Sequence, residues 1–70
     1  YENNFEPYFR IFYIYTITEE YMIACEYLEK AIKTGFRNVE RIKESFKYNE
    51  LKKIEKFQAL MKKYFPNVSL

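Results

Sequence analysis

The sequence predicts a small all-α domain, and three observations carry that prediction. Only one glycine and two prolines interrupt the 70 residues, whereas a β-sheet domain needs turn residues about every 8–12 positions. Apolar residues recur at spacings of three and four in the middle and at the end of the chain, which is the period of an amphipathic helix. Apolar residues also make up 49% of the chain and aromatic residues 21%, which excludes a disordered segment.

The first expected helix spans residues 8–18, and Pro7 lies in its first turn, where proline is best tolerated. Its residues read YFRIFYIYTIT, and this β-branched and aromatic composition by itself favours a strand. No alternation with a period of two is present, however, and apolar residues lie on all sides of the segment. We therefore expect a helix that is buried on several sides.

A second helix is expected from Glu19 to Thr34, with Thr18 as its N-cap and Gly35 closing it at the C′ position. Cys25 lies beside the apolar stripe of this helix, where we expect a small buried side chain rather than a nucleophile. The stripe comprises Tyr21, Ala24, Leu28, Ala31 and Ile32.

Two more helices are expected in the second half of the chain. Asn38 caps the first of them, which directs Val39, Ile42 and Phe46 inward. After a turn around residues 47–49, one continuous helix is expected over residues 50–64, and Pro66 ends it. The expected buried residues of this last helix are Leu51, Ile54, Phe57, Leu60, Met61 and Tyr64.

The first two helices together resemble a tetratricopeptide repeat, a helix–turn–helix unit of about 34 residues. The positions that carry this resemblance are Tyr8, Ile11, Tyr15, Tyr21, Ala24, Leu28 and Ala31. One position departs from the family pattern, because Phe12 stands where the family has glycine or alanine.

The second half resembles the segment that terminates tetratricopeptide arrays in many bacterial proteins. Two Asp-Pro dipeptides of that pattern are replaced here by Ser45-Phe46 and Ile54-Glu55. The resemblance implies a single domain over residues 1–70, with a hairpin at 7–34 and a capping segment at 36–64. Because no initiating methionine is present, we expect a fragment or the terminal part of a longer array. The matching residues are Gly35, Phe36, Ile42, Leu51, Phe57 and Leu60.

The resemblance also implies a binding surface, since the first helix of each hairpin forms the concave face of a tetratricopeptide array. Family members that clamp a terminal carboxylate have Lys, Arg and Asn there, whereas this chain has mainly aromatic and neutral residues. The expected function is therefore a non-catalytic protein–protein interaction or scaffold module with an apolar groove. Its expected partner is a preceding repeat, another protein or a second copy of itself. The positions concerned are Glu6, Phe9, Tyr13, Thr16 and Ile17.

A small basic nucleic-acid-binding or assembly subunit is the alternative. Residues 1–35 hold three basic side chains and six glutamates, a net charge of −3, while residues 36–70 hold nine basic and four acidic side chains, or +5. Two features disfavour this alternative: the pI of about 8.7 lies below the value of about 9 typical of such domains, and the charges are spread around the helices. The last helix is amphipathic enough for a membrane surface, but its lysines suit an ordinary surface helix equally well. The candidate phosphate contacts are Arg41, Lys52, Lys53 and Lys56.

Catalysis, metal binding and cofactor binding are not expected from this residue inventory. The chain contains no histidine, no aspartate and no glycine-rich phosphate loop. A single cysteine permits no internal disulfide and indicates a reducing compartment such as the cytoplasm. No apolar run approaches the length of about 18 residues that a membrane-spanning helix needs.

Overall fold

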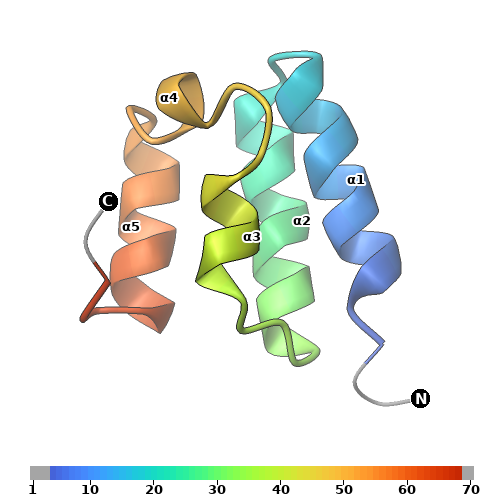
Figure 1. Cartoon of the computed structure of the whole chain (residues 1–70), viewed down its shortest axis with the longest axis vertical. Coiled ribbons are helices and arrows are strands. Elements are labelled where there is room, and N and C mark those ends of the chain that lie inside the picture. Colours follow the sequence, from blue (N-terminus) through green and yellow to red (C-terminus); the bar gives the residue numbers. More distant parts are fainter. Residues whose placement is uncertain (1–3, 69–70) are drawn as a thin grey trace.

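The computed structural model describes residues 4–68, and over this range the chain forms five helices and no β-strand (Figure 1). The all-α prediction is confirmed, and the β-prone first segment is a helix. The helices are α1 (Glu6–Ile17), α2 (Tyr21–Lys33), α3 (Val39–Lys43), α4 (Tyr48–Leu51) and α5 (Glu55–Tyr64).

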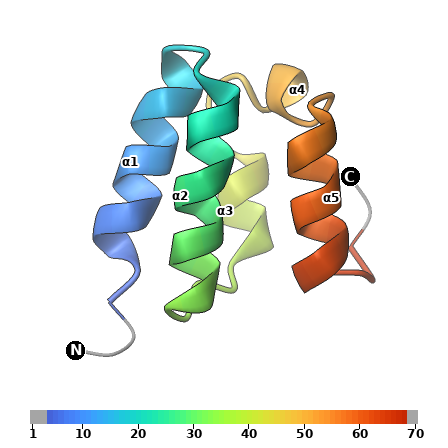
Figure 2. The ribbon, with the colours of Figure 1, turned by 180° about the vertical axis from the view of Figure 1, so that it is seen from behind.

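The four main helices alternate in direction around one core. Figures 1 and 2 show α2 and α3 on opposite faces of the molecule, with α1 and α5 at its flanks and α4 at one end. Helices α1 and α3 run in the same direction, and α2 and α5 run opposite to them. The largest fully buried side chains come from every main helix and from the connections: Phe12, Leu28, Ile32, Phe36, Ile42, Leu51, Phe57 and Met61.

Burial on one side explains why α1 is helical despite its β-prone composition. Phe9, Phe12 and Thr16 form a buried stripe at spacings of three and four. The hydroxyl of Thr16 donates a hydrogen bond to the Phe12 carbonyl at 2.8 Å, so this polar group is satisfied inside the core. The expectation of burial on several sides is wrong, because Tyr13 is 39% exposed and Ile14 is 57% exposed.

The turn between α1 and α2 is built differently from the predicted one. Thr18 does not cap α2; its hydroxyl lies 3.2 Å from the carbonyls of both Ile14 and Tyr15 and so belongs to the end of α1. The N-cap of α2 is Glu20, whose side chain makes no capping bond. Backbone bonds from Glu19 to Thr16 and from Glu20 to Tyr15 close the turn, and Glu19 adopts a positive φ of 65°.

The end of α2 matches the prediction. Gly35 has a φ of 118°, and its N–H donates to the Ile32 carbonyl at 3.1 Å. The next N–H, that of Phe36, reaches back to the Ala31 carbonyl at 3.0 Å, which completes a Schellman motif. The turn directs Phe36 into the core, where it is almost fully buried.

The start of α3 also matches the prediction, but the residues that follow it do not. The Asn38 side chain accepts a bond from the Arg41 N–H at 3.2 Å, as an N-cap does. Ile42 is buried and Val39 half-buried, whereas Phe46, which we expected to point inward, is 59% exposed. The chain turns at Lys47, which has a φ of 67°, and α4 begins directly after it.

Residues 50–64 do not form the continuous helix that we expected. The helix stops at Leu51, Ile54 adopts an extended conformation, and α5 begins at Glu55. Leu51 and Phe57 are both fully buried, yet on one straight helix their side chains would point about 120° apart. The break lets both reach the core, and it leaves Ile54 only half-buried.

Replacing Gly35 with alanine tests the turn after α2. A β-carbon at a φ of 118° is sterically unfavourable, so we expect Gly35→Ala to lower the free energy of unfolding by about 1–3 kcal/mol. Urea denaturation followed by far-UV circular dichroism measures this change. Lys33→Ala, at an exposed position of the same helix end, serves as the control and should change stability by less than about 0.5 kcal/mol. Equal stability of the two variants would contradict the assignment.

A candidate binding groove between helices α1 and α3

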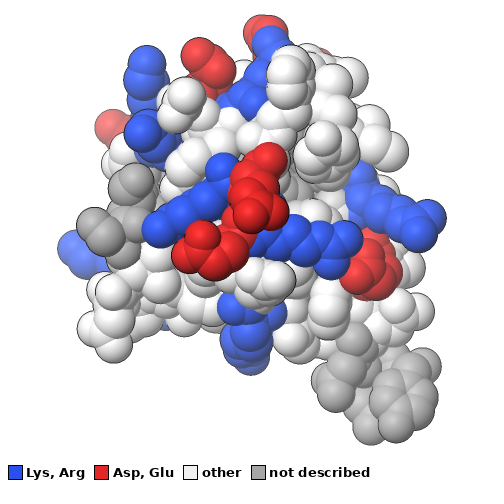
Figure 3. Space-filling model, in the orientation of Figure 1, with Lys and Arg blue, Asp and Glu red and all other residues white. Residues whose placement is uncertain are grey.

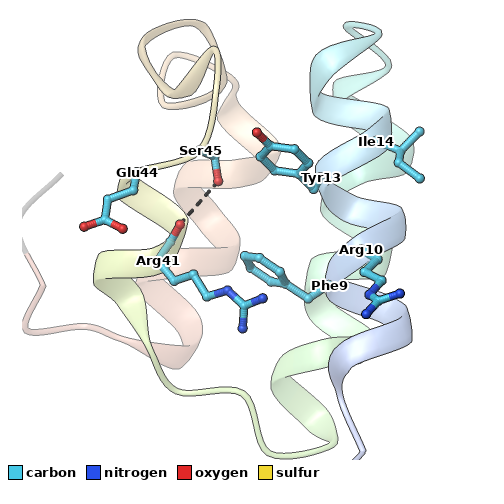
Figure 4. A pocket seen from close by; sticks show the side chains of 7 residues that line it. All are labelled: Phe9, Arg10, Tyr13, Ile14, Arg41, Glu44 and Ser45. Carbon is cyan, nitrogen blue, oxygen red and sulfur yellow. Dashed lines mark hydrogen bonds between the residues drawn. The ribbon is translucent and has the colours of Figure 1, made fainter.

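A groove of about 420 Å³ runs between α1 and α3. Figure 4 shows the rings of Phe9 and Tyr13 extending from α1 toward α3, while Arg41 extends from α3 toward α1. The surface inside is mainly apolar, with a polar rim on the α3 side. The lining residues are Phe9, Arg10, Tyr13, Ile14, Arg41, Glu44 and Ser45.

The floor of the groove is fixed by the core beneath it. The ring of Phe9 is stacked on that of Phe36, with ring centroids 4.6 Å apart, and only 5% of Phe9 remains exposed. Tyr13, one helical turn further along α1, keeps 39% of its surface exposed. Phe9 therefore supplies a rigid base, and Tyr13 supplies the accessible aromatic surface.

Arg41 forms the rim of the groove and is held on two sides. Its guanidinium carbon lies 4.5 Å from the centroid of the Phe9 ring, a cation–π contact. Its two terminal nitrogens donate to the two carboxylate oxygens of Glu6 at 2.9 and 3.3 Å. These hydrogen bonds lower the pKa of the Glu6 carboxyl and raise the pKa of Arg41. The pair links α1 to α3 and keeps the guanidinium beside the groove.

The five predicted surface positions of the first helix are divided among three environments. Phe9 and Tyr13 line the groove, and Glu6 holds its rim through Arg41. Ile17 is 39% exposed but does not line the groove. Thr16 is fully buried and bonded to the α1 backbone, so it has no surface to offer a partner.

Sequence reasoning missed the α3 side of the groove. Glu44 and Ser45 follow Arg41 by three and four positions, and the Ser45 hydroxyl lies 3.5 Å from the Arg41 carbonyl. The helical spacing that unites them is visible in the sequence. That they face Phe9 and Tyr13, however, depends on tertiary structure.

The four predicted phosphate contacts do not form one surface. Arg41 is paired with Glu6, and Lys56 lies 3.4 Å from Glu26. Lys52 and Lys53 do lie together, with Lys62, on a second groove of about 590 Å³ whose floor is apolar. No carboxylate lines this basic groove, as far as the described residues show. Its remaining lining residues are Gln58, Met61, Phe65, Pro66 and Val68.

Salt bridges within residues 4–68 account for much of the charge asymmetry between the two halves of the chain. Each of them joins a glutamate of the first half to a basic residue of the second half. The pairs are Glu6–Arg41, Glu19–Lys47, Glu26–Lys56 and Glu29–Lys63.

Cys25 is buried, as the sequence predicts. It lies 1% exposed among α2 and α5 residues, and desolvation raises the pKa of its thiol to about 11. A thiol with so high a pKa is almost entirely protonated at neutral pH and is a poor nucleophile.

The described part of the chain contains no cluster of three His, Cys, Asp or Glu side chains able to hold a metal ion. None of its helices has the length and hydrophobicity needed to cross a bilayer. No protein-family model, curated protein or solved structure matches the chain. The groove itself is lined by two cations, a carboxylate, two hydroxyls and aromatic rings, an arrangement suited to binding a side chain or peptide segment.

The environment of Cys25 is tested by its reaction with a thiol reagent at neutral pH. We expect the native chain to react about a hundredfold more slowly than the chain in urea, because burial raises the thiol pKa from 9.0 to about 11. The control is a Cys25→Ala, Ala59→Cys variant, whose single thiol lies at an exposed α5 position and should react at similar rates in both conditions. Equally fast reaction of native and unfolded Cys25 would contradict its burial.

Proposed function

We propose that the chain is a non-catalytic protein–protein interaction module that binds a segment of a partner protein in the groove between α1 and α3. The observation that carries this proposal is the exposed ring of Tyr13, placed above the buried ring of Phe9 and opposite the Arg41 guanidinium. Tyrosine and arginine are the residue types most enriched at interface hot spots, together with tryptophan.

The rigidity of the groove favours binding. Phe9 is fixed by Phe36, and Arg41 by Glu6 and Phe9, so little side-chain freedom remains to be lost when a partner docks. An apolar side chain of the partner would cover Tyr13 and the edge of Phe9. A carbonyl or carboxylate next to it would accept a hydrogen bond from Arg41 or Ser45.

We also propose that the fold is that of a tetratricopeptide hairpin with a capping segment. The antiparallel arrangement of α1 and α2 supports this, as does the position of α3 beside α1 across the groove. The Schellman turn at Gly35 and the breaks on either side of α4 are also compatible with the capping segment of such an array. In this proposal α1 and α3 are the two helices that line the concave face.

Selection of binders from a displayed library of random peptides tests the groove. We expect the selected peptides to share an apolar or aromatic residue, and Tyr13→Ala to weaken their binding at least about tenfold, measured by fluorescence polarisation. Phe9 is unsuitable for this test because its loss would damage the core. Phe46→Ala is the matched control, since this exposed aromatic side chain lies outside the groove. If Phe46→Ala has the larger effect, or Tyr13→Ala has none, the groove is not the binding site.

Nucleic-acid binding is retained as a second candidate because of the basic groove. Lys52, Lys53 and Lys62 provide three cations for phosphates, and Phe65 is a half-buried ring beside them. Cationic grooves with an aromatic side chain are typical of proteins that bind single strands. Against this candidate, Arg41 and Lys56 are paired with glutamates elsewhere on the molecule.

A labelled single-stranded oligonucleotide tests this second candidate by fluorescence anisotropy. If it is correct, Lys52→Glu with Lys53→Glu abolishes binding, and the affinity of the wild-type chain falls steeply with salt because phosphate contacts release counterions. Lys30→Glu with Lys33→Glu, on α2, gives the same change in net charge outside the basic groove. Equal effects of the two pairs, or no binding by the wild type, would exclude a nucleic-acid site there.

A further inference from the structure

Two charged side chains on opposite margins of the groove have no ionic partner of their own. Arg10 lines the groove from α1, and Glu44 lines it from α3. Figure 4 shows Arg10 on the side of α1 farther from α3 and Glu44 on the side of α3 farther from α1, with the rings of Phe9 and Tyr13 between them. Both charged side chains are exposed, and neither forms a salt bridge with another of the described residues. The groove therefore has a positive margin on α1 and a negative margin on α3.

Arg41, the other cation of the groove, is already neutralised by Glu6. The two terminal nitrogens of its guanidinium donate to the two carboxylate oxygens of Glu6. These hydrogen bonds, and to a smaller extent the charge of Arg10, lower the pKa of the Glu6 carboxyl, so the pair stays ionised at neutral pH. Arg10 thus lies near Glu6 without being paired to it, because both carboxylate oxygens bond to Arg41 instead. A partner in the groove meets a paired centre at Arg41 and an unpaired cation at Arg10.

The negative margin extends along α3. Glu40 precedes Glu44 by four positions, about one helical turn, is exposed, and forms no salt bridge among the described residues either. The basic residue that follows Glu44 at helical spacing, Lys47, is bound to Glu19 at 2.6 Å. Figure 3 shows acidic side chains, with basic ones on either side, over α3 on the face that Figure 1 presents. A cation of a partner that reaches Glu44 therefore has a second carboxylate nearby.

The order of groups across the groove determines which kind of segment fits it. The apolar centre at Phe9 and Tyr13 contributes affinity when an apolar side chain covers it, whereas charges at a rim contribute mainly specificity. A carboxylate of the partner is favoured at Arg10 and disfavoured at Glu44, and a cation of the partner has the opposite preference. A segment with two like charges would always place one of them against a like charge of the groove.

We propose that the segment bound in this groove carries an apolar or aromatic side chain between two oppositely charged ones, with its carboxylate at Arg10 and its cation at Glu44. Such a segment crosses from α3 to α1 over Tyr13 rather than following either helix. This inference rests on the proposed function, because it concerns the occupant of the same groove. It adds the charge pattern of that occupant and the direction in which it crosses the groove.

Charge reversal on both sides of the interface tests this charge pattern, with peptides selected on the wild-type chain and binding measured by fluorescence polarisation. We expect Arg10→Glu to weaken binding at least about tenfold, and a lysine in place of the peptide's acidic residue to restore it. Glu44→Lys should be rescued only by a glutamate in place of the peptide's basic residue. Arg10→Gln, which adds no carboxylate beside Glu6, should have a smaller effect in the same direction. Lys33→Glu, at an exposed position of α2, is the control for net charge and should change the affinity by less than about twofold.

Selected peptides that lack the two opposite charges, or reversals that no complementary peptide rescues, overturn the inference. Occupation of the groove by a second copy of the chain also overturns it; sedimentation equilibrium would then give a dimer mass that Tyr13→Ala reduces. Circular dichroism checks that each variant remains helical. Tyr13→Ala is measured on the same peptides. If it weakens binding while neither charge reversal does, this inference fails and the proposed function stands, whereas no effect of Tyr13→Ala refutes both.

Discussion

The contact between Phe36 and Phe9 connects the two halves of the molecule, and much of the remaining structure depends on it. Phe36 follows Gly35 directly, so the turn that ends α2 also sets the direction in which this ring enters the core. There it stacks on Phe9 at 4.6 Å and meets Phe5 edge-on at 5.2 Å. Because Phe9 is fixed from below, it presents a firm face to the Arg41 guanidinium. The packing of Phe36 on Phe9 therefore links three features: the left-handed turn, the position of α3 and the floor of the groove.

Complementary charge reinforces this connection at the surface. The first half of the chain is acidic and the second half basic, and every salt bridge among residues 4–68 crosses from one half to the other. Exposed pairs of this kind each contribute only about 0–1 kcal/mol, so the core supplies most of the stability. The pairs instead favour this placement of α3 and α5 against the hairpin over alternatives that bring like charges together. The charge asymmetry that suggested a nucleic-acid surface is thus largely accounted for by ion pairs between the two halves of the same chain.

The parts of the fold that could be predicted from sequence are those with a local cause. The apolar periods of α2 and α5, the cap at Asn38 and the turn at Gly35 all follow from residues close together in the chain. The break before α5 is hard to predict because the steps of three from Leu51 to Ile54 and from Ile54 to Phe57 each suit a helix, and only over both steps together do the side chains of Leu51 and Phe57 diverge, by about 120°. The groove was half predictable: Phe9 and Tyr13 are on a helix that the sequence identifies, but its α3 wall exists only after packing.

Helix α1 also shows why a prediction of secondary structure from amino-acid propensity alone fails for its residues. One side carries Phe9, Phe12 and Thr16 and is buried in the core. This burial compensates for the weak intrinsic helical preference of the segment. The other side still carries tyrosine and isoleucine: Tyr13 and Ile14 both line the groove, and Ile17 is exposed beyond it. Stability requires only the first side. Exposed tyrosine and isoleucine side chains increase the tendency to aggregate and contribute little to a monomer, so their presence on a small, otherwise well-charged surface supports the proposal that a partner covers the groove.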